Sequence, residues 1–104
     1  MTDFHSPSRN RLFKAILELK DIEECYAFFE DLMTIRELED MSQRMDTAVL
    51  LDQGAAYQTI SREVGVSTAT ISRVNRCLQY GSGGYRLALD RLKSSEINAE
   101  EEQK

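Results

Sequence analysis

Apolar residues recur at helical spacing along almost the whole chain, and no stretch alternates apolar and polar residues as a half-buried strand does. The first pattern predicts a helix over about residues 9–19. Its apolar side consists of Leu12, Phe13, Ile16 and Leu17. A second helix is predicted to begin after Asp21, because this residue precedes Glu24 by three positions, as an N-cap precedes its N3 partner. These patterns predict an all-α protein.

The second predicted helix has one apolar face and one acidic face. The apolar face consists of Ile22, Cys25, Tyr26, Phe29, Leu32 and Met33. The other face carries Glu23, Glu24, Glu30 and Asp31. An acidic face of this kind is typical of a solvated surface, so we do not interpret it as a ligand site.

The longest predicted helix begins with a second capping-box spacing, Thr34 to Glu37, and ends before Gly54. Its apolar residues occupy a wide arc, with Leu50 and Leu51 outside it. Those within the arc are Ile35, Leu38, Met41, Met45, Ala48 and Val49. Such a helix is apolar on more than one side. It is either the central helix of a monomeric bundle or a helix whose two faces are both covered in a dimer.

After Gly54 the pattern predicts two shorter helices, over 57–64 and 67–79, joined by a tight turn. Gly65 permits the positive φ of that turn, and Ser67 is placed to cap the helix that follows. This arrangement predicts a helix-turn-helix over about 57–79, with a small residue, Ser61, where the two helices cross. Its apolar anchors are Ile60, Val64, Val66, Ile71 and Val74.

The helix over 67–79 has a narrow apolar stripe and a broad polar face that contains no carboxylate. Short hydroxyl side chains and arginines on such a face are suited to reading base edges in a major groove, where phosphates would repel acids. We expect this helix to bind DNA through Ser67, Thr68, Ala69, Thr70, Ser72, Arg73 and Arg76. Of these, Thr70 and Arg76 are expected nearer the DNA backbone. The alternative is a helical pair that merely packs.

The charge of the 104-residue chain is uneven and agrees with this assignment. The net charge is -5, yet residues 54–93 hold six basic and only two acidic residues, whereas residues 1–53 hold 12 acidic and six basic residues. We predict a domain over 9–93, a flexible N-terminus over 1–8 and a disordered acidic tail over 94–104. A domain this small buries a modest core, which favours association with a second copy.

The residues that would indicate an enzyme or a metal site are missing from the sequence. Cys25 and Cys77 are 52 positions apart and only His5 is available to join them, so no zinc site is predicted. We expect both cysteines to be reduced and buried as small apolar residues. No pairing of nucleophile and base, no phosphate-binding glycine motif and no apolar run long enough to span a membrane is present. We therefore expect a cytoplasmic protein without catalytic activity or cofactor.

Several longer runs resemble the YerC/YecD branch of the Trp-repressor-like proteins. They are TIRELEDMSQR, ISREVGVSTATISRVNRCLQYGSGGYR and LALDRL, and the similarity extends over most of residues 9–93. The resemblance implies a six-helix fold, an intertwined homodimer whose shared core comes from the first three helices, and one reading helix per chain. It also implies a transcriptional regulator whose partner is double-stranded DNA.

The resemblance also points to a candidate effector pocket. The Trp repressor holds tryptophan between two arginines, which Arg44 and Arg73 match, and Thr34 matches a threonine near that pocket. Val74 and Cys77, however, stand where the repressor has a glycine and a serine that accommodate the ligand. We therefore expect that tryptophan is not the corepressor, and the sequence identifies no other effector. Arg44 is alternatively an ion-pair partner of nearby acids such as Asp40.

Two functions from different classes remain compatible with the sequence. The first is a dimeric, sequence-specific DNA-binding regulator that reads the major groove with the helix 67–79. The second is a helical protein-interaction module, which the overall negative charge and the acidic tail favour. The glycines at 81, 83 and 84 are expected to end the reading helix and to turn the chain into a last helix near Tyr85.

Overall fold

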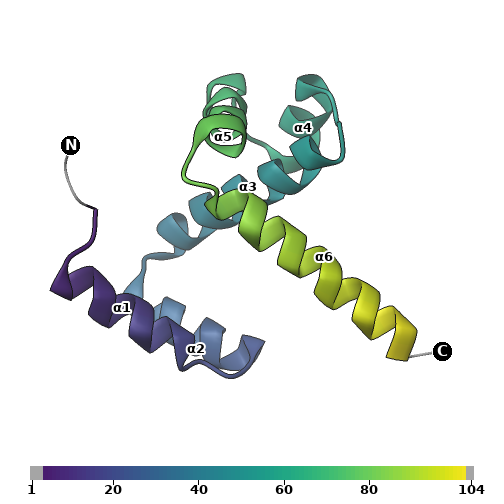
Figure 1. Cartoon of the computed structure of the whole chain (residues 1–104). Helices are drawn as coiled ribbons and strands as arrows, with labels where there is room; N and C mark the ends of the chain where they lie inside the picture. The colour runs from purple at the N-terminus through teal and green to yellow at the C-terminus, as the bar shows by residue number, and fades with distance from the viewer. Residues whose placement is uncertain (1–3, 103–104) are drawn as a thin grey trace. The chain divides into compact units, whose positions relative to one another are not determined.

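The computed structural model describes residues 4–102, with side chains for residues 4–97. This part of the chain contains no strand, which confirms the all-α class and the six helices that the family resemblance implied (Figure 1). The helices are α1 (Pro7–Leu17), α2 (Ile22–Leu32), α3 (Ile35–Asp52), α4 (Tyr57–Val64), α5 (Thr68–Tyr80) and α6 (Gly84–Glu102). The chain divides into two compact units, with the boundary after Leu38, inside α3.

The first unit contains two helices whose beginnings are fixed by local caps. Helix α1 begins two residues earlier than predicted because Ser6 Oγ accepts a hydrogen bond from the Arg9 N–H at 3.1 Å and Pro7 occupies the first turn. In α2 the predicted cap is confirmed, since the Glu24 N–H donates to Asp21 Oδ1 at 2.8 Å. The Glu24 carboxylate in turn accepts from the Lys20 N–H at 2.9 Å, which completes a reciprocal cap.

Apolar side chains of the first unit remain largely uncovered within the chain. Neither α1 nor α2 has a buried residue. The exposed fraction is 80% for Leu17 and 72% for Ile22. Half of the residues of the two predicted apolar faces, including Leu17 and Ile22, are exposed, whereas others, such as Leu12 and Phe29, are half-buried. The exposed part of these faces is available to another molecule.

Helix α3 begins with the predicted capping box. The Thr34 N–H donates to Glu37 Oε1 at 2.9 Å, and the Glu37 N–H donates to Thr34 Oγ1 at 3.1 Å. These hydrogen bonds, the backbone one first, lower the pKa of Glu37 below its ordinary value because they favour the charged form. The helix ends at Asp52, and Gly54 follows with a φ of 84°, in the left-handed region that favours glycine.

The second unit has a core to which three helices contribute. Ala48 of α3, Val74 of α5 and Leu89 of α6 are buried together. Partly buried side chains packed against them are Met45, Val49, Leu51, Leu78 and Tyr85. Because α5 supplies a residue to the centre of this core, its orientation is coupled to α3 and α6.

A carboxylate at the end of α3 joins this helix to α6. Asp52 Oδ1 lies 2.5 Å from Arg86 Nη2, and Asp52 Oδ2 lies 2.5 Å from Lys93 Nζ. The side chain of Asp52 is only 12% exposed, and Lys93 and then Arg86 lower its pKa below the ordinary value. Asp52 likewise raises the pKa of Arg86. The pairing holds the first turns of α6 against α3.

Helix α6 is longer than the sequence predicted. It continues through residues 94–102, where we expected a disordered tail, because no glycine or proline follows Gly84 and the segment is rich in good helix formers. Residues 103–104 of that tail and residues 1–3 of the predicted flexible N-terminus lie outside the described residues. Within the described range, no helix has the length and apolar character needed to cross a membrane.

Candidate nucleic-acid interface

The turn between α4 and α5 has the geometry that the sequence predicted, together with one contact that it did not. Gly65 adopts a φ of 84°, and its N–H donates to the Ser61 carbonyl at 3.0 Å. The Ser61 hydroxyl also donates to the Val66 carbonyl at 2.8 Å. Ser61 is therefore more than a small residue at the crossing, because its hydroxyl holds the outgoing end of the turn.

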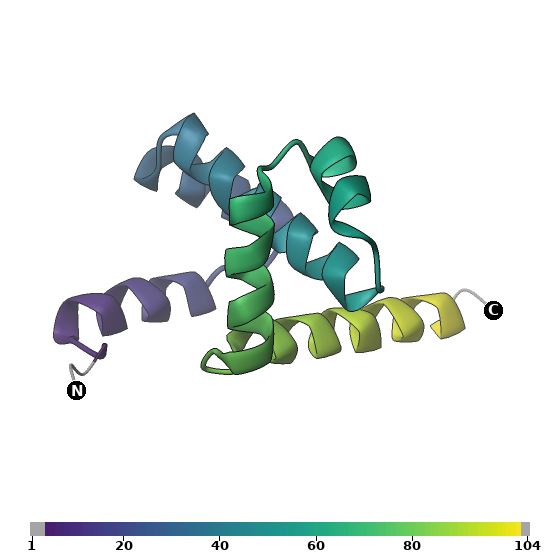
Figure 2. The same ribbon diagram turned by 90° about the horizontal axis from the view of Figure 1, so that it is seen from above.

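Apolar anchors fix α4 and α5 within the second unit. Ile60 and Ile71 are 0% exposed and Val74 is 1% exposed, while Val64 and Val66 are half-buried. The anchors predicted for a helix-turn-helix are thus on the inner side of both helices. Figure 2 shows α4 beside α5, with the turn between them.

The beginning of α5 is held by a cap made of two hydroxyl residues. Ser67 Oγ accepts from the Thr70 N–H at 3.2 Å and donates to Thr70 Oγ1, also at 3.2 Å. Thr70 is half-buried, whereas Ser67 is exposed. Both residues were predicted to contact DNA, and in this structure their hydroxyl groups are bonded to each other at the start of the helix.

The other five predicted DNA contacts share one exposed face of α5. They are Thr68, Ala69, Ser72, Arg73 and Arg76. Their spacing of one, four, five and eight residues from Thr68 places them on the side opposite the buried Ile71 and Val74. The helix contains no Asp or Glu, so the face presents hydroxyl groups and two guanidinium groups without a neighbouring carboxylate on the same helix.

Tyr80, the last residue of α5, was not among the contacts predicted from the sequence. Its side chain is 82% exposed and lies one helical turn beyond Arg76. The spacing of four residues between Arg76 and Tyr80 places Tyr80 on the same side of the helix, and this could have been read from the sequence. An exposed tyrosine at the end of this face offers an aromatic ring and a hydroxyl group for contact with another molecule.

Glycine is required directly after α5. A Cβ atom at Gly81 would lie 2.4 Å from the Cys77 carbonyl oxygen, and the Gly81 N–H donates to the same oxygen at 2.9 Å. Gly83 follows with a φ of 90°, and α6 begins at Gly84. The expectation that these glycines end α5 and lead into the last helix is therefore confirmed.

The residues of the candidate effector pocket have different surroundings. Val74 is buried in the core with Ala48 and Leu89, whereas Arg44, Arg73 and Cys77 are exposed. Thr34 belongs to the first unit, where its hydroxyl accepts the hydrogen bond from Glu37. Val74 therefore fills space between helices of its own chain.

The prediction that both cysteines are buried is wrong. Cys77 is exposed on α5, because the buried side of this helix is taken up by Ile71 and Val74 and Cys77 lies beside that stripe. Cys25 is half-buried on α2, and both thiols are free. Among the described side chains, no group of three His, Cys, Asp or Glu residues comes together to hold a metal ion.

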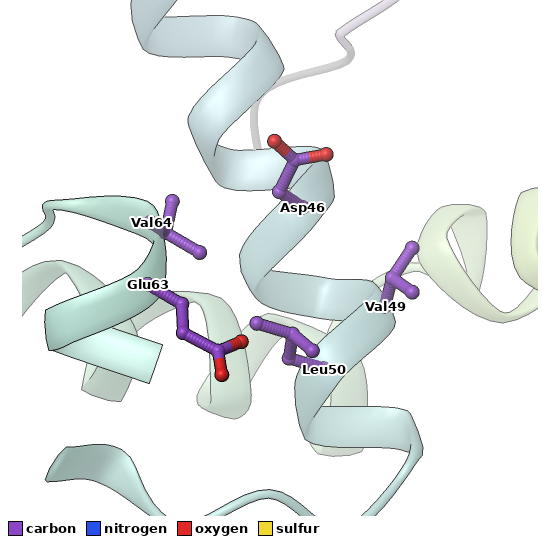
Figure 3. Close-up of a pocket in the computed structure, with 5 residues that line it drawn as sticks. All are labelled: Asp46, Val49, Leu50, Glu63 and Val64. Carbon is purple, nitrogen blue, oxygen red and sulfur yellow. The ribbon is translucent and has the colours of Figure 1, made fainter. Parts of the chain in front are cut away.

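A shallow hollow of about 320 Å³ lies between α3 and α4 (Figure 3), and none of its lining residues belongs to α5. It is lined by Asp46, Val49, Leu50, Glu63 and Val64. The carboxylate of Glu63 reaches toward Leu50. The two acids make this hollow unsuitable for phosphate groups, and none of the candidate effector residues lines it.

Comparison with known proteins agrees with this architecture. Residues 8–93 match the family described as Trp repressor protein. The chain is 52% identical over 90 residues to the uncharacterized protein YerC of Bacillus subtilis strain 168, and the match covers 86% of each protein. The resemblance to the YerC branch is therefore confirmed.

Two solved structures are similar to this chain. A protein from Staphylococcus aureus, described provisionally as a Trp repressor, is 48% identical with a TM-score of 0.83, and the match covers 86% of this chain and 89% of that one. A TrpR-like protein from Eubacterium eligens is also 48% identical, with a TM-score of 0.82, and covers 85% of this chain and 91% of that one. The residues that match the family, 8–93, include the helix-turn-helix.

Proposed function

The chain belongs to the Trp repressor family, and from that membership we propose that it is a cytoplasmic, dimeric, sequence-specific DNA-binding regulator of transcription. Helix α5 enters the major groove. Thr68, Ala69, Ser72 and Arg73 contact base edges, while Ser67 and Thr70 at the helix start, together with Arg76, lie nearer the phosphate backbone.

The observation that carries this proposal is the exposed face of α5. It is free of carboxylates and holds two arginines, in a chain whose net charge is -5. Its opposite side is anchored by Ile71 and Val74, so the face is presented on a rigid element. A rigid helix with short polar side chains and arginines is what direct readout of a major groove requires.

Dimerisation is supported by the apolar side chains that the single chain leaves exposed. Three of the large apolar residues that are at least 70% exposed, Leu17, Ile22 and Ile35, lie on α1, on α2 and at the start of α3. These are the helices that the family resemblance assigns to a shared core. A second copy would cover them and would also present a second α5, as two-fold related half-sites require.

We further propose that tryptophan is not the corepressor. Val74 is buried between α3, α5 and α6, and its β-branched side chain has one strongly preferred rotamer in a helix, so it does not swing aside to admit an indole ring. Overpacking such a site costs about 1–3 kcal/mol. DNA binding would then be constitutive or governed by another effector.

The test is DNA binding by the Arg73→Ala variant. With a site selected from a random duplex pool, the variant should lose about 1–3 kcal/mol of binding free energy if Arg73 reads a base. Arg91→Ala on α6 is the matched control, since it removes one exposed arginine outside the helix-turn-helix. Equal binding by the Arg73 variant and wild type would show that the reading face is assigned wrongly.

The alternative is a protein-interaction module without direct DNA binding. It is favoured by the net charge of -5 and by the exposed apolar residues of the first unit. The salt dependence of DNA binding distinguishes the two functions. Binding to DNA releases counterions, so the logarithm of the binding constant should fall linearly with the logarithm of the salt concentration. Absence of any DNA affinity at low salt would favour the interaction module.

A further inference from the structure

The longest stretch of the sequence without an acidic residue is longer than the proposed DNA contacts on α5 require. Residues 64–89 contain none of the 18 aspartates and glutamates of the chain. Helix α5 accounts for only half of these 26 positions, and the proposed contacts end at Arg76. The acid-free stretch therefore continues past the assigned contacts, through the end of α5 and the glycine-rich loop, into the beginning of α6.

Tyr80 is the large side chain that this stretch leaves exposed. Among the described large apolar and aromatic residues of the second unit it has the highest exposed fraction, 82%. Tyr85, five positions later, instead packs against the core. The Tyr80 hydroxyl makes no hydrogen bond with another described residue, whereas the neighbouring Gln79 amide donates to Asn75 Oδ1 at 3.2 Å. The Tyr80 hydroxyl is therefore available to an acceptor outside the chain.

Helical geometry places Tyr80 on the same face as the proposed DNA contacts. An α-helix turns about 100° per residue, so Tyr80 points about 120° away from Thr68. On the same measure Arg76 lies at about 80° and Arg73 at about 140°, on either side of Tyr80. The buried Ile71 lies at about 300°, directly opposite Tyr80. The exposed face of α5 thus continues without interruption to its last residue.

The length of α5 places Tyr80 beyond the groove that its first residues would enter. Thr68 and Tyr80 are 12 positions apart. That separation corresponds to a rise of about 18 Å along the helix axis. The major groove of B-DNA is about 12 Å wide, and a recognition helix contacts bases with its N-terminal residues. The last turn of α5 therefore leaves the groove beside the strand that borders it, where phosphates and not base edges are in reach.

The chain that follows Tyr80 leaves room for a phosphate. Three of the next four residues are glycines, and Ser82, the fourth, is exposed. A Cβ atom added at either of the last two glycines would meet no atom within 4 Å. Asp90 is the first acid beyond the loop, and its carboxylate pairs with Arg86, as does that of Asp52. Between Tyr80 and Asp90 neither a bulky side chain of the loop nor a carboxylate opposes an approaching anion.

We propose that Tyr80 is a further DNA-contact residue, whose hydroxyl donates a hydrogen bond to a phosphate oxygen of the duplex backbone. This rests on the proposed function and extends the contact surface of α5 by one helical turn beyond Arg76. Tyrosine is one of the side chains through which proteins contact phosphates, and such contacts fix the register of the protein on the duplex without reading its sequence. Duplex DNA is the occupant that continuity with the exposed face of α5 and the surrounding acid-free stretch favour.

The experiment compares Tyr80→Phe with wild type in binding to a selected site and to a duplex of unrelated sequence. The substitution removes the hydroxyl and keeps the ring. The affinity should fall by roughly three- to tenfold for both duplexes, because a phosphate contact is lost whatever the sequence. The slope of log K against log salt should stay within about 0.5 of wild type, because the lost donor is uncharged and releases no counterion.

Two further variants isolate the effect. Tyr26→Phe removes the same group from an exposed tyrosine of α2, in the first unit, and should bind both duplexes as wild type does. Arg76→Gln removes a charge from the same face as Tyr80 and should reduce the salt slope by about 0.9 per bound chain, which shows that the assay detects a lost ionic contact. Circular dichroism and sedimentation establish that the variants fold and associate as wild type does.

The outcomes separate this proposal from the proposed function. If wild type binds DNA and Tyr80→Phe binds both duplexes equally well, the role of Tyr80 is overturned while the role of α5 stands. If the loss is confined to the selected site and relaxes the preference at one base pair, Tyr80 contacts a base and the phosphate assignment is overturned. A changed oligomeric mass would overturn it in favour of contact with a second copy of the chain. If wild type has no DNA affinity at low salt, both proposals fall.

Discussion

Replacement of Val74 by alanine tests whether this residue is structural core or the wall of an effector site. Val74 is 1% exposed and packs with Ala48 and Leu89. The substitution removes two buried methyl groups, worth about 0.8 kcal/mol each, and leaves a cavity that adds to the loss. The higher helix propensity of alanine returns about 0.5 kcal/mol. The expected loss in the free energy of unfolding is about 2 kcal/mol.

The assay is urea denaturation followed by circular dichroism, at one fixed protein concentration because unfolding of the proposed dimer would depend on concentration. Cys77→Ala, on the exposed part of the same helix, is the control and should change stability by less than about 0.5 kcal/mol. A Val74→Ala variant as stable as this control would refute the packing account. It would indicate that Val74 borders open space, and tryptophan binding would then have to be reconsidered.

Three other features of the molecule can be tested separately. Asp52→Asn should lower the urea midpoint at neutral pH, because Lys93 and Arg86 lower the pKa of Asp52 in the folded state. The contribution of the Asp52 carboxylate to the free energy of unfolding is present above about pH 4 and is lost as the pH falls through the folded-state pKa. The urea midpoints of the variant and wild type should therefore converge in acid. Gly81→Ala should cost about 1–3 kcal/mol, whereas Gly84→Ala, which meets no neighbour, should not. Sedimentation at micromolar concentration should give about twice the chain mass of 11.9 kDa, and a folded monomer would contradict the proposed dimer.

Local features of the fold were predictable from the sequence because their causes are local. The capping pairs Asp21 with Glu24 and Thr34 with Glu37 involve residues three positions apart, and both form as predicted. The α4–turn–α5 segment was predicted almost to the residue, because Gly65 and Ser67 fix the turn and the next cap. The exposed face of α5 follows directly from helical periodicity.

Features that depend on distant residues were not predictable in this way. The pairing of Asp52 with Arg86 joins residues 34 positions apart, and no local spacing indicates it. The end of α6 was placed too early, because an acidic polar segment was interpreted as disordered although its residues are also good helix formers. Val74 could be assigned to an apolar stripe from sequence, but its burial against α3 and α6 required the tertiary structure.

Selection of bound fragments from a random pool of duplex DNA tests the central claim, that α5 reads a specific sequence, most directly. The purified chain should enrich a two-fold related pair of half-sites about one helical turn apart, since two copies of α5 must reach successive major grooves on one side of the duplex. The same selection with Arg73→Ala should relax the preference at one position of each half-site. Fragments recovered without any common sequence from the wild-type protein would contradict the claim.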